Sequence, residues 1–368
     1  MAGKVYFIDF RADVQNSLMS KLHKLLDRAG LGQVVQERDL TAVKMHFGEM
    51  GNAAYIRPTY LRQVVAAVKQ AGGIPFLTDA NTLYAGTRSD APHHLTTAVQ
   101  NGFAYAVVEA PLVIADGLRG RSEVPVDVNG KHCESVYIGR EIVEADVFIS
   151  VAHFKGHELT GFGGAIKNTG MGAASRRGKL AMHSTVSPQV KAENCIGCGE
   201  CVDHCSQQAL SVSDELAVVD EAKCIGCGEC ILICPNSAIE IKWDQEIPTF
   251  LETIVEYTAG VLKNKQGKSL FINFITDVSP ACDCYPTNDA PIVKNIGVAA
   301  STDPVAVDQA SVDLVNAEPA LAGTQLTVNT EPGGDKFKGL YPNVDWSIQL
   351  EYGEKLGLGS REYELIRL

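Results

Sequence analysis

Eight cysteines in two short runs have the most specific spacing in this chain. Each run follows Cys-x2-Cys-x2-Cys-x3-Cys, and the motif CIGCGEC opens both, at Cys195–Cys201 and at Cys224–Cys230. The fourth cysteine of each run is Cys205 or Cys234. A [4Fe–4S] cluster needs four thiolates, and in two-cluster proteins the fourth cysteine of one run ligates the other cluster. The pattern predicts two [4Fe–4S] clusters and electron transfer as their function.

The two predicted ligand sets therefore cross between the runs. One set is Cys195, Cys198, Cys201 and Cys234. The other set is Cys224, Cys227, Cys230 and Cys205. Structural zinc, the simpler alternative, usually takes four ligands, so eight cysteines in a double run favour iron–sulfur. The segment resembles a bacterial dicluster ferredoxin with all eight ligands present, although Ser206 stands where that family usually has proline.

A second candidate site is the stretch HFKGHELTGFGGAIKNTGMGAASRRGKLAMH at 153–183. Its five cationic side chains outnumber its single acidic residue, Glu158, although the chain as a whole is acidic. Its seven glycines would let backbone N–H groups approach an anion, which lysine or arginine then neutralises. The pattern predicts a pocket for a carboxylate or phosphate. The alternative is a flexible surface loop with scattered charge.

Within this stretch we predict four catalytic residues, which are Lys155, His157, Lys167 and His183. The two lysines and His157 would bind or protonate an anionic small-molecule substrate. A histidine supplies protons readily because its unperturbed pKa lies near neutrality. Lys44 and His46 end a predicted strand, where open α/β sheets usually bind ligands, so we expect them in the same pocket. The alternative places both on the outer face of a half-buried strand.

Cys282 and Cys284 form a third cysteine group just beyond a predicted strand. Two thiolates are too few to close a metal site, so one histidine would have to complete it, drawn from His153, His157 and His183. An additional metal at Cys282 and Cys284 is one hypothesis. Two free thiols or a redox-active pair are the alternatives. Cys133, which stands alone, is interpreted as an ordinary thiol.

An α/β scaffold must position these side chains. Strand-like segments precede the cysteine runs at 4–10, 43–47, 74–78, 107–114 and 147–151. Helix-like segments alternate with them near 18–29 and 58–68, and the rhythm returns after residue 244. It continues with a helix at 250–262, a strand at 270–278 and a helix that begins at Asp303-Pro304. This order predicts an α/β fold with a mostly parallel sheet and flanking helices.

The cysteine runs interrupt that scaffold as a module of different composition. Residues 188–244 contain ten acidic residues and three lysines, which is more than half of the net charge of −12. The two CIGCGEC copies begin 29 residues apart, which indicates a pseudo-two-fold unit. We therefore predict three parts. They are the first part of an α/β domain at 1–187, a dicluster ferredoxin insert at 188–244 and the completing part of the α/β domain at 245–368.

Charge and composition exclude some partners. An acidic surface repels phosphate backbones, so we expect no nucleic acid, whereas it suits a basic redox partner protein. No run of about 18 apolar residues occurs, so we expect no membrane span. The N-terminus does not resemble a signal peptide, so we expect a cytoplasmic protein, whose 11 cysteines act as ligands rather than in disulfides. No nicotinamide fingerprint follows a predicted strand.

Several stretches outside the cysteine runs resemble one family. They are VKMHFGE, DANTLYAG, NGF at 101–103, HFKGHELTGFGGAIKNTGMG and STDPVAVD. They resemble the uncharacterised iron–sulfur-centre protein family known as domain of unknown function 362, over nearly the whole chain. The resemblance implies an α/β scaffold with a ferredoxin insert and favours a functional role for Cys282 and Cys284. It implies no agreed reaction or substrate.

The leading functional hypothesis is a ferredoxin-linked oxidoreductase. Electrons would enter the acidic insert, pass the two clusters and reach an anionic small molecule in the basic, glycine-rich pocket. A bare electron carrier needs only the insert, yet this chain has about 300 further residues, which favours an enzyme. One alternative is a non-enzymatic electron carrier or adaptor that docks a partner redox enzyme. Another is a redox sensor.

Overall fold

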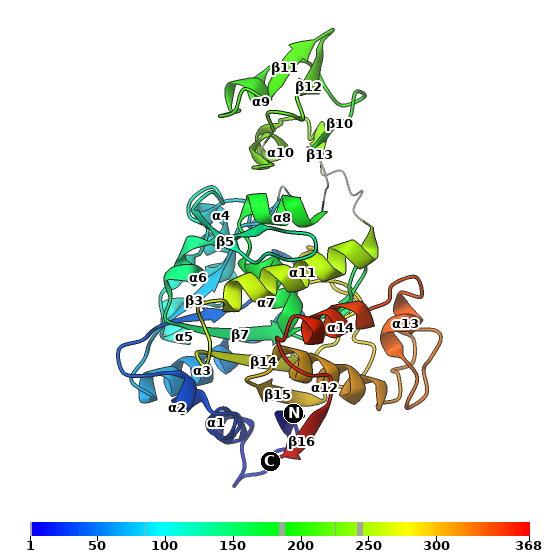
Figure 1. The fold of residues 1–368 in the computed structure, drawn as a ribbon. Coiled ribbons are helices and arrows are strands. Elements are labelled where there is room, and N and C mark those ends of the chain that lie inside the picture. The colour runs from blue at the N-terminus through cyan, green and yellow to red at the C-terminus, as the bar shows by residue number, and fades with distance from the viewer. Residues whose placement is uncertain (1, 85, 184–187, 225, 241–245) are drawn as a thin grey trace.

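A mixed sheet of eight strands forms the centre of the computed structural model, which describes residues 2–84, 86–183, 188–224, 226–240 and 246–368. The strands are β1 (Gly3–Asp9), β2 (Leu40–Lys44), β3 (Ile74–Asp79), β4 (Leu112–Ile114), β7 (Val147–His153), β14 (Ser269–Ile275), β15 (Gly297–Ser301) and β16 (Tyr363–Arg367). Their order is β16-β1-β15-β14-β7-β2-β3-β4 (Figure 1). β15 runs antiparallel to β1 and β14, and the other adjacent pairs are parallel. The predicted α/β fold with a mostly parallel sheet is confirmed.

Two predicted strands are partly wrong. The strand expected at 43–47 is β2, which spans Leu40–Lys44, so residues 45–47 lie beyond it. The apolar run at 107–114 divides into the helical turn α5 (Tyr105–Val108) and the short strand β4. Glu109 ends the turn in a left-handed conformation, with φ of 60°. Pro111 follows and cannot donate a hydrogen bond to a neighbouring strand. The sheet therefore gains three residues from this run rather than eight.

Helices cover both faces of the sheet and bury two apolar cores. The first face carries α5 together with α1 (Leu18–Arg28), α2 (Leu31–Val34), α3 (Pro58–Gln70) and α4 (Ala91–Gln100). The second face carries α7 (Ala165–Ala173), α11 (Ile247–Leu262), α12 (Pro304–Asn316) and α14 (Ser347–Lys355). The smaller elements are β5 (Glu123–Asp127), β6 (Ser135–Gly139), α6 (Arg140–Glu144), β8 (Lys155–His157), β9 (Gly161–Gly163), α8 (Arg176–His183) and α13 (Lys336–Leu340).

Helix α12 begins as its sequence predicts and then supports a second helix. Asp303 is its N-cap, and the carboxylate accepts a hydrogen bond from the Ala306 N–H at 2.8 Å. One turn further on, the buried carboxylate of Asp308 accepts the N–H groups of Ala165 and Ile166 at 2.7 and 2.9 Å. These are the first N–H groups of α7, so a carboxylate from a distant helix satisfies the positive end of α7. This contact fixes where α7 begins.

Residues 188–240 form a small unit that stands apart from the sheet, beyond α8 (Figure 1). Its elements are β10 (Gln189–Val190), α9 (Glu200–Asp203), β11 (Leu210–Ser213), β12 (Leu216–Val219), α10 (Glu229–Ile233) and β13 (Ile239–Glu240). β10 pairs with β13, and β11 pairs with β12, both antiparallel. The predicted boundaries at 187/188 and 244/245 adjoin residues 184–187 and 241–245, which lie outside the described residues. The three-part division of the chain stays a prediction.

No helix in the described part of the chain is long and apolar enough to cross a membrane. The longest helix in the described residues, α11, has 16 residues and packs against α7 and α14. Its apolar side chains therefore face the core of the protein.

We predict that Asp308→Ala destabilises the fold by about 3 kcal/mol, because it leaves two buried N–H groups of α7 without an acceptor. Asp13→Ala is a matched control: Asp13 also accepts two backbone N–H groups, at 2.8 and 2.7 Å, but it is exposed. Water replaces that lost acceptor, so we expect a loss below about 1 kcal/mol. Urea unfolding measures both free energies, and equal losses would contradict the role given to Asp308.

Candidate functional site

A cavity of about 560 Å³ opens where four neighbouring parallel strands end. The strands are β3, β2, β7 and β14, and the loops that follow their carboxyl ends form the cavity wall. Lys44 ends β2, Asp79 ends β3 and His153 ends β7, while Cys282 and Cys284 lie in the loop after β14. Open α/β sheets usually bind ligands at this edge. The cavity is the candidate functional site.

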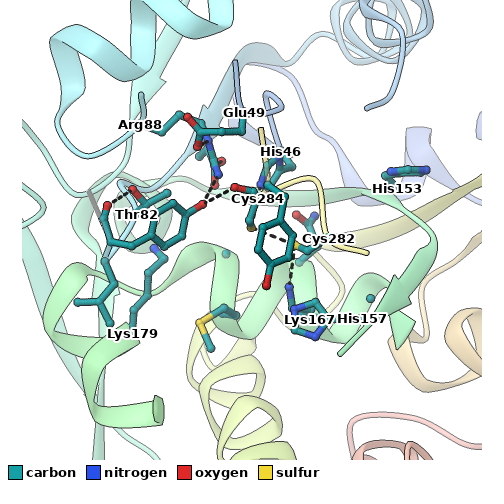
Figure 2. A pocket seen from close by; sticks show the side chains of 18 of the residues that line it. His46, Glu49, Thr82, Arg88, His153, His157, Lys167, Lys179, Cys282 and Cys284 are labelled. Carbon is teal, nitrogen blue, oxygen red and sulfur yellow. Dashed lines mark hydrogen bonds and ion pairs between the residues drawn. The ribbon is translucent and has the colours of Figure 1, made fainter. Parts of the chain in front are cut away.

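The four residues predicted to be catalytic all line this cavity. Lys155 and His157 come from β8, Lys167 from α7, and His183 from the end of α8. Figure 2 shows Lys167 and His157 on the same side of the cavity, below Cys282. The structure therefore brings together residues that are up to 28 positions apart in the chain. Their catalytic roles stay predictions.

The glycine-rich stretch is ordered in the structure, and its glycines permit close packing. It forms the hairpin β8–β9 and the helices α7 and α8 rather than a surface loop. A Cβ at Gly156 would lie 2.2 Å from the carbonyl oxygen of Pro280, and a Cβ at Gly172 would lie 2.5 Å from Lys44 Nζ. The predicted backbone cradle for an anion is not formed at α7, because Asp308 already accepts its first N–H groups. The cationic groups that face the cavity are therefore side chains, among them Lys44, Lys155 and Lys167.

Charged side chains pair along one wall of the cavity. Lys44 Nζ lies 3.0 Å from Asp79 Oδ1, and Arg88 contacts both Asp79 Oδ2 at 3.4 Å and Glu49 Oε2 at 3.1 Å. Burial by itself would raise the pKa of Asp79, but Lys44 and nearby histidines hold it well below its usual value. Burial lowers the pKa of Lys44, and Asp79 opposes that effect. The alternative that placed Lys44 on an outer face is therefore wrong, because its side chain is buried at this ion pair.

Asp283, which lies between the two cavity cysteines, is completely buried and joins two parts of the wall. His153 Nδ1 lies 2.9 Å from both carboxylate oxygens of Asp283, and Lys155 Nζ lies 3.3 Å from Oδ2. His153 Nε2 lies 2.7 Å from the carbonyl oxygen of Thr276. Both ring nitrogens of His153 thus lie within hydrogen-bond distance of acceptors, which holds the ring between Asp283 and the end of β14. Burial opposes ionisation of Asp283, but His153 and Lys155 hold its pKa far below the usual range.

The two cavity cysteines lie against each other. Cys282 Sγ and Cys284 Sγ are 3.0 Å apart, and Lys167 Nζ lies 3.6 Å from Cys282 Sγ. The hydrogen bond between the two sulfurs is the main cause that lowers the pKa of Cys282 to about 5, Lys167 and Lys155 lower it as well, and burial opposes them. His46 Nε2 lies 3.4 Å from Cys284 Sγ. The sequence had offered His153, His157 or His183 as the neighbouring histidine, and the structure places His46 there (Figure 2).

Two predicted proton donors are neutral in this environment. Burial, together with the nearby charge of Lys167, lowers the pKa of His157 to about 3. Burial is also the main cause that lowers the pKa of His183 to about 3. His157 Nδ1 accepts the N–H groups of Leu159 and Thr160 at 3.2 and 3.3 Å, so its proton is on Nε2. We therefore expect His157 to donate a hydrogen bond from a neutral ring instead of acting as an acid.

The eight cysteines of the two runs surround two small cavities in the unit at 188–240. The first cavity is lined by Cys195, Cys198, Cys201 and Cys234. The second cavity is lined by Cys205, Cys224, Cys227 and Cys230. Each cavity therefore has three cysteines from one run and the fourth from the other. Backbone N–H groups also point at three of these sulfurs, with Ala217, Ala209 and Ala238 donating to Cys195, Cys205 and Cys234 at 3.2–3.4 Å.

In the described residues, no group of three or more His, Cys, Asp or Glu side chains converges as the ligands of a single metal ion do. This holds for the cysteine runs and for Cys282 with Cys284. A [4Fe–4S] cubane carries its thiolates at separate corners, so its four ligands stand around a volume instead of converging on a point. The four cysteines of each set stand around a cavity, and their role as cluster ligands stays a prediction.

One glutamate ties the cysteine unit to the α/β body. Glu229 is buried, and its carboxylate lies 2.9 Å from Arg119, 3.1 Å from Arg121 and 3.3 Å from Arg176. Glu200 has the same place in the first CIGCGEC copy, yet it is exposed. The second copy therefore faces the body and the first faces away. Leu83 and Leu180 of the body share an apolar cluster with the unit.

Several residues of the site were not indicated by the sequence. No role was assigned from the sequence to Asp283, which lies between two cysteines. None was assigned to Asp79, the first residue of DANTLYAG, or to Arg88, two residues after that motif. Asp79 could have been found as a charged residue at the carboxyl end of an apolar strand, the same signal that Lys44 gave. No comparable signal marked Arg88 or Glu229, because only the folded chain brings their partners to them.

The fold and the site define a mixed α/β protein with a cavity at the carboxyl ends of its parallel strands. The chain belongs to the family described as a domain of unknown function (DUF362), which it matches over residues 41–313. No curated protein matches it. Among solved structures it is similar to the lactate racemase apoprotein from Thermoanaerobacterium thermosaccharolyticum, at 13% identity and a TM-score of 0.37. That match covers 74% of this chain and 51% of the racemase, so the chain spans about half the length of that relative.

We predict that Glu229→Gln loosens the cysteine unit, because the buried Arg176 then loses one of its counter-charges and keeps Asp116. Arg119 and Arg121 are more exposed and contribute less, so we expect a local loss of about 2 kcal/mol, or roughly thirtyfold faster amide exchange in α8 and α10. Hydrogen exchange followed by mass spectrometry measures this. Glu200→Gln is the matched control and should exchange like the unmodified protein. Equal exchange in the two variants would contradict the docking role of Glu229.

Proposed function

We propose that this protein carries two [4Fe–4S] clusters in residues 188–244 and acts as an oxidoreductase on an anionic small molecule in the 560 Å³ cavity. The observation that carries the proposal is the pairing of cysteines around two cavities. Each set of four combines three cysteines of one run with the fourth of the other, as a dicluster ferredoxin requires. Chance packing of eight thiols gives no reason for this crossed pairing.

The surroundings of the cysteines suit anionic sulfur. The backbone N–H groups of Ala209, Ala217 and Ala238 donate to one cysteine of the second set and two of the first. Such N–H···S bonds stabilise thiolate charge and tune the reduction potential of a bound cluster. A bound [4Fe–4S] cluster would supply one-electron redox chemistry. The protein's part is to hold the thiolates in place, which the two short helices and strand pairs of this unit do.

The docking of the unit supports a direction for the electrons. Because Glu229 attaches the second copy to the body, the cavity of Cys224, Cys227 and Cys230 lies on the side of the α/β domain. A Cβ at Gly228 would lie 2.9 Å from Leu83, which itself lines the large cavity. Cys198 of the first set is exposed. We propose that a basic redox partner protein docks near Cys198 and that electrons leave toward the large cavity.

The charge of the large cavity supports an anionic substrate. Its wall contains five cationic side chains, Lys44, Arg88, Lys155, Lys167 and Lys179, against the carboxylates of Glu49, Asp79 and Glu158. Asp283 offsets Lys155 and the sulfur of Cys282 offsets Lys167, so individual cationic side chains, rather than a large net charge, would bind the anion. A bare carrier protein has no use for such a cavity, which favours an enzyme over a non-enzymatic carrier or adaptor.

Iron and acid-labile sulfide counts on anaerobically prepared protein test the clusters. We expect about eight irons and eight sulfides per chain. Cys234→Ser should lower the iron content toward four, because it removes one ligand of the first set. Cys133→Ser is the matched control, since Cys133 belongs to neither set, and it should keep the full count. Four or fewer irons in the unmodified protein would overturn the dicluster assignment.

Small anions test the cavity. Oxalate or phosphate at a hundred times its Kd should stabilise the folded protein by about 2.7 kcal/mol, seen as a higher Tm. Lys155→Met should lose that response, whereas Lys131→Met, a change at an exposed lysine outside the cavity, should keep it. Each variant is compared with its own anion-free Tm, so that a general loss of stability does not count. An equal response in Lys155→Met would favour the carrier alternative.

A further inference from the structure

The Cys282–Cys284 pair is placed for redox chemistry of its own. The two sulfurs are 3.0 Å apart, and both residues line the large cavity. A disulfide bond is about 2.05 Å long, so bond formation needs a movement of about an ångström. Cys282 is nearly completely buried, but a molecule in the cavity can reach it. No other pair of thiols outside the two cysteine runs is available in the described chain, because Cys133 stands alone.

The groups around the pair suit thiolate better than a metal ion. The Gly48 N–H donates to His46 Nδ1 at 3.0 Å, so the proton of His46 is on Nε2. That proton points at Cys284 Sγ, 3.4 Å away, where a metal-binding histidine would present a lone pair. Lys167, on the other side, directs its ammonium at Cys282. A cation bound by both sulfurs would face this ammonium and a ring N–H group, which both oppose it.

The loop that carries the pair is held by contacts to its backbone and to Asp283. Tyr84 donates to the Cys284 carbonyl at 3.2 Å, Tyr341 donates to the Pro280 carbonyl at 2.6 Å, and the Glu49 N–H donates to the Asp283 carbonyl at 3.1 Å. The Asp283 side chain is fixed by His153 and Lys155. These contacts leave the two sulfurs free while they fix the backbone on both sides. The pair therefore stays close in its reduced form.

We propose that Cys282 and Cys284 form a redox-active dithiol that cycles with a disulfide inside the cavity and stores two electrons. On oxidation the thiolate of Cys282 and the thiol of Cys284 form one S–S bond, the S–H bond of Cys284 breaks, and its proton passes to water in the cavity. The two electrons pass to a small disulfide, which takes up one proton and is cleaved to one thiol and one thiolate, or singly to the two [4Fe–4S] clusters. The second route rests on the proposed function, whereas the dithiol itself does not.

The dithiol is tested by poising the anaerobic, full-length protein in glutathione redox buffers and then trapping free thiols with iodoacetamide under denaturing conditions. Mass spectrometry of the peptide that contains Cys282 and Cys284 distinguishes two alkylated thiols from an intramolecular disulfide. We expect one transition with a two-electron slope. Cys133 should remain alkylated throughout, and Cys284→Ser should show no intramolecular disulfide. Two alkylated thiols at every poise would overturn the proposal.

Two further measurements separate the alternatives. Lys167→Met should raise the disulfide-to-dithiol ratio about tenfold at a fixed poise, because it removes a charge that stabilises the reduced pair, whereas Lys131→Met should not. The metal content of the protein tests the other alternative. If the protein contains zinc, or more iron than its clusters need, and Cys284→Ser loses this additional metal, then the pair is a metal site instead. Iron and sulfide counts on the same samples report on the clusters independently. Eight irons without a dithiol transition would overturn only the dithiol, and a transition without clusters would overturn only the clusters.

Discussion

The cavity depends on the contacts that the buried carboxylate of Asp283 makes with His153 and Lys155. Removing such a group from water costs several kcal/mol unless opposite charges and hydrogen bonds surround it. His153 at the end of β7 and Lys155 in β8 supply both. The Asp283 carboxylate and the Lys155 ammonium each offset the cost of burying the other. Their pairing joins the loop after β14 to the neighbouring strand, and thereby sets the positions of the two cysteines that flank Asp283.

The same constraint acts along the rest of the cavity wall. Lys44 is stable in its buried position because Asp79 lies 3.0 Å away, and Arg88 in turn connects Asp79 with Glu49. Such networks position side chains more than they stabilise the fold, because the cost of removing the charges from water offsets much of their Coulombic attraction. They leave Lys167, His157 and the cysteine pair directed into the cavity (Figure 2). The ion pairs therefore fix the backbone and side chains of the wall from which these groups project.

A different contact relates the cysteine unit to this cavity. The unit is an internal repeat, and a repeat by itself gives no reason for either copy to face the body. Three arginines of the α/β body pair with Glu229 in the second CIGCGEC copy, whereas Glu200 in the first copy is exposed to solvent. In the proposed function this asymmetry gives the electrons an entry side and an exit side. In that proposal the pairing of Glu229, and not of the equivalent Glu200, sets the direction of electron transfer.

The sequence by itself determined the features that depend on local spacing. The order of strands and helices, the start of α12 at Asp303, and the crossed cysteine sets all follow from periodicity or from ligand spacing within short segments. Lys155, His157, Lys167 and His183 were found in the same way, because one composition-biased stretch contains them all. Helix formation and turn chemistry act over a few residues, so a linear pattern records them.

Only the tertiary structure decided which distant charges meet. Asp283 and His153 are 130 residues apart, Glu229 and Arg119 are 110 apart, and Asp308 lies 143 residues from the α7 residue that it caps. It also showed that the glycines serve packing and that His157 and His183 are neutral, since burial sets both outcomes. Burial and pairing are properties of the assembled sheet edge. These properties arise only when β2, β3, β7 and β14 lie side by side, so no single segment of the sequence predicts them.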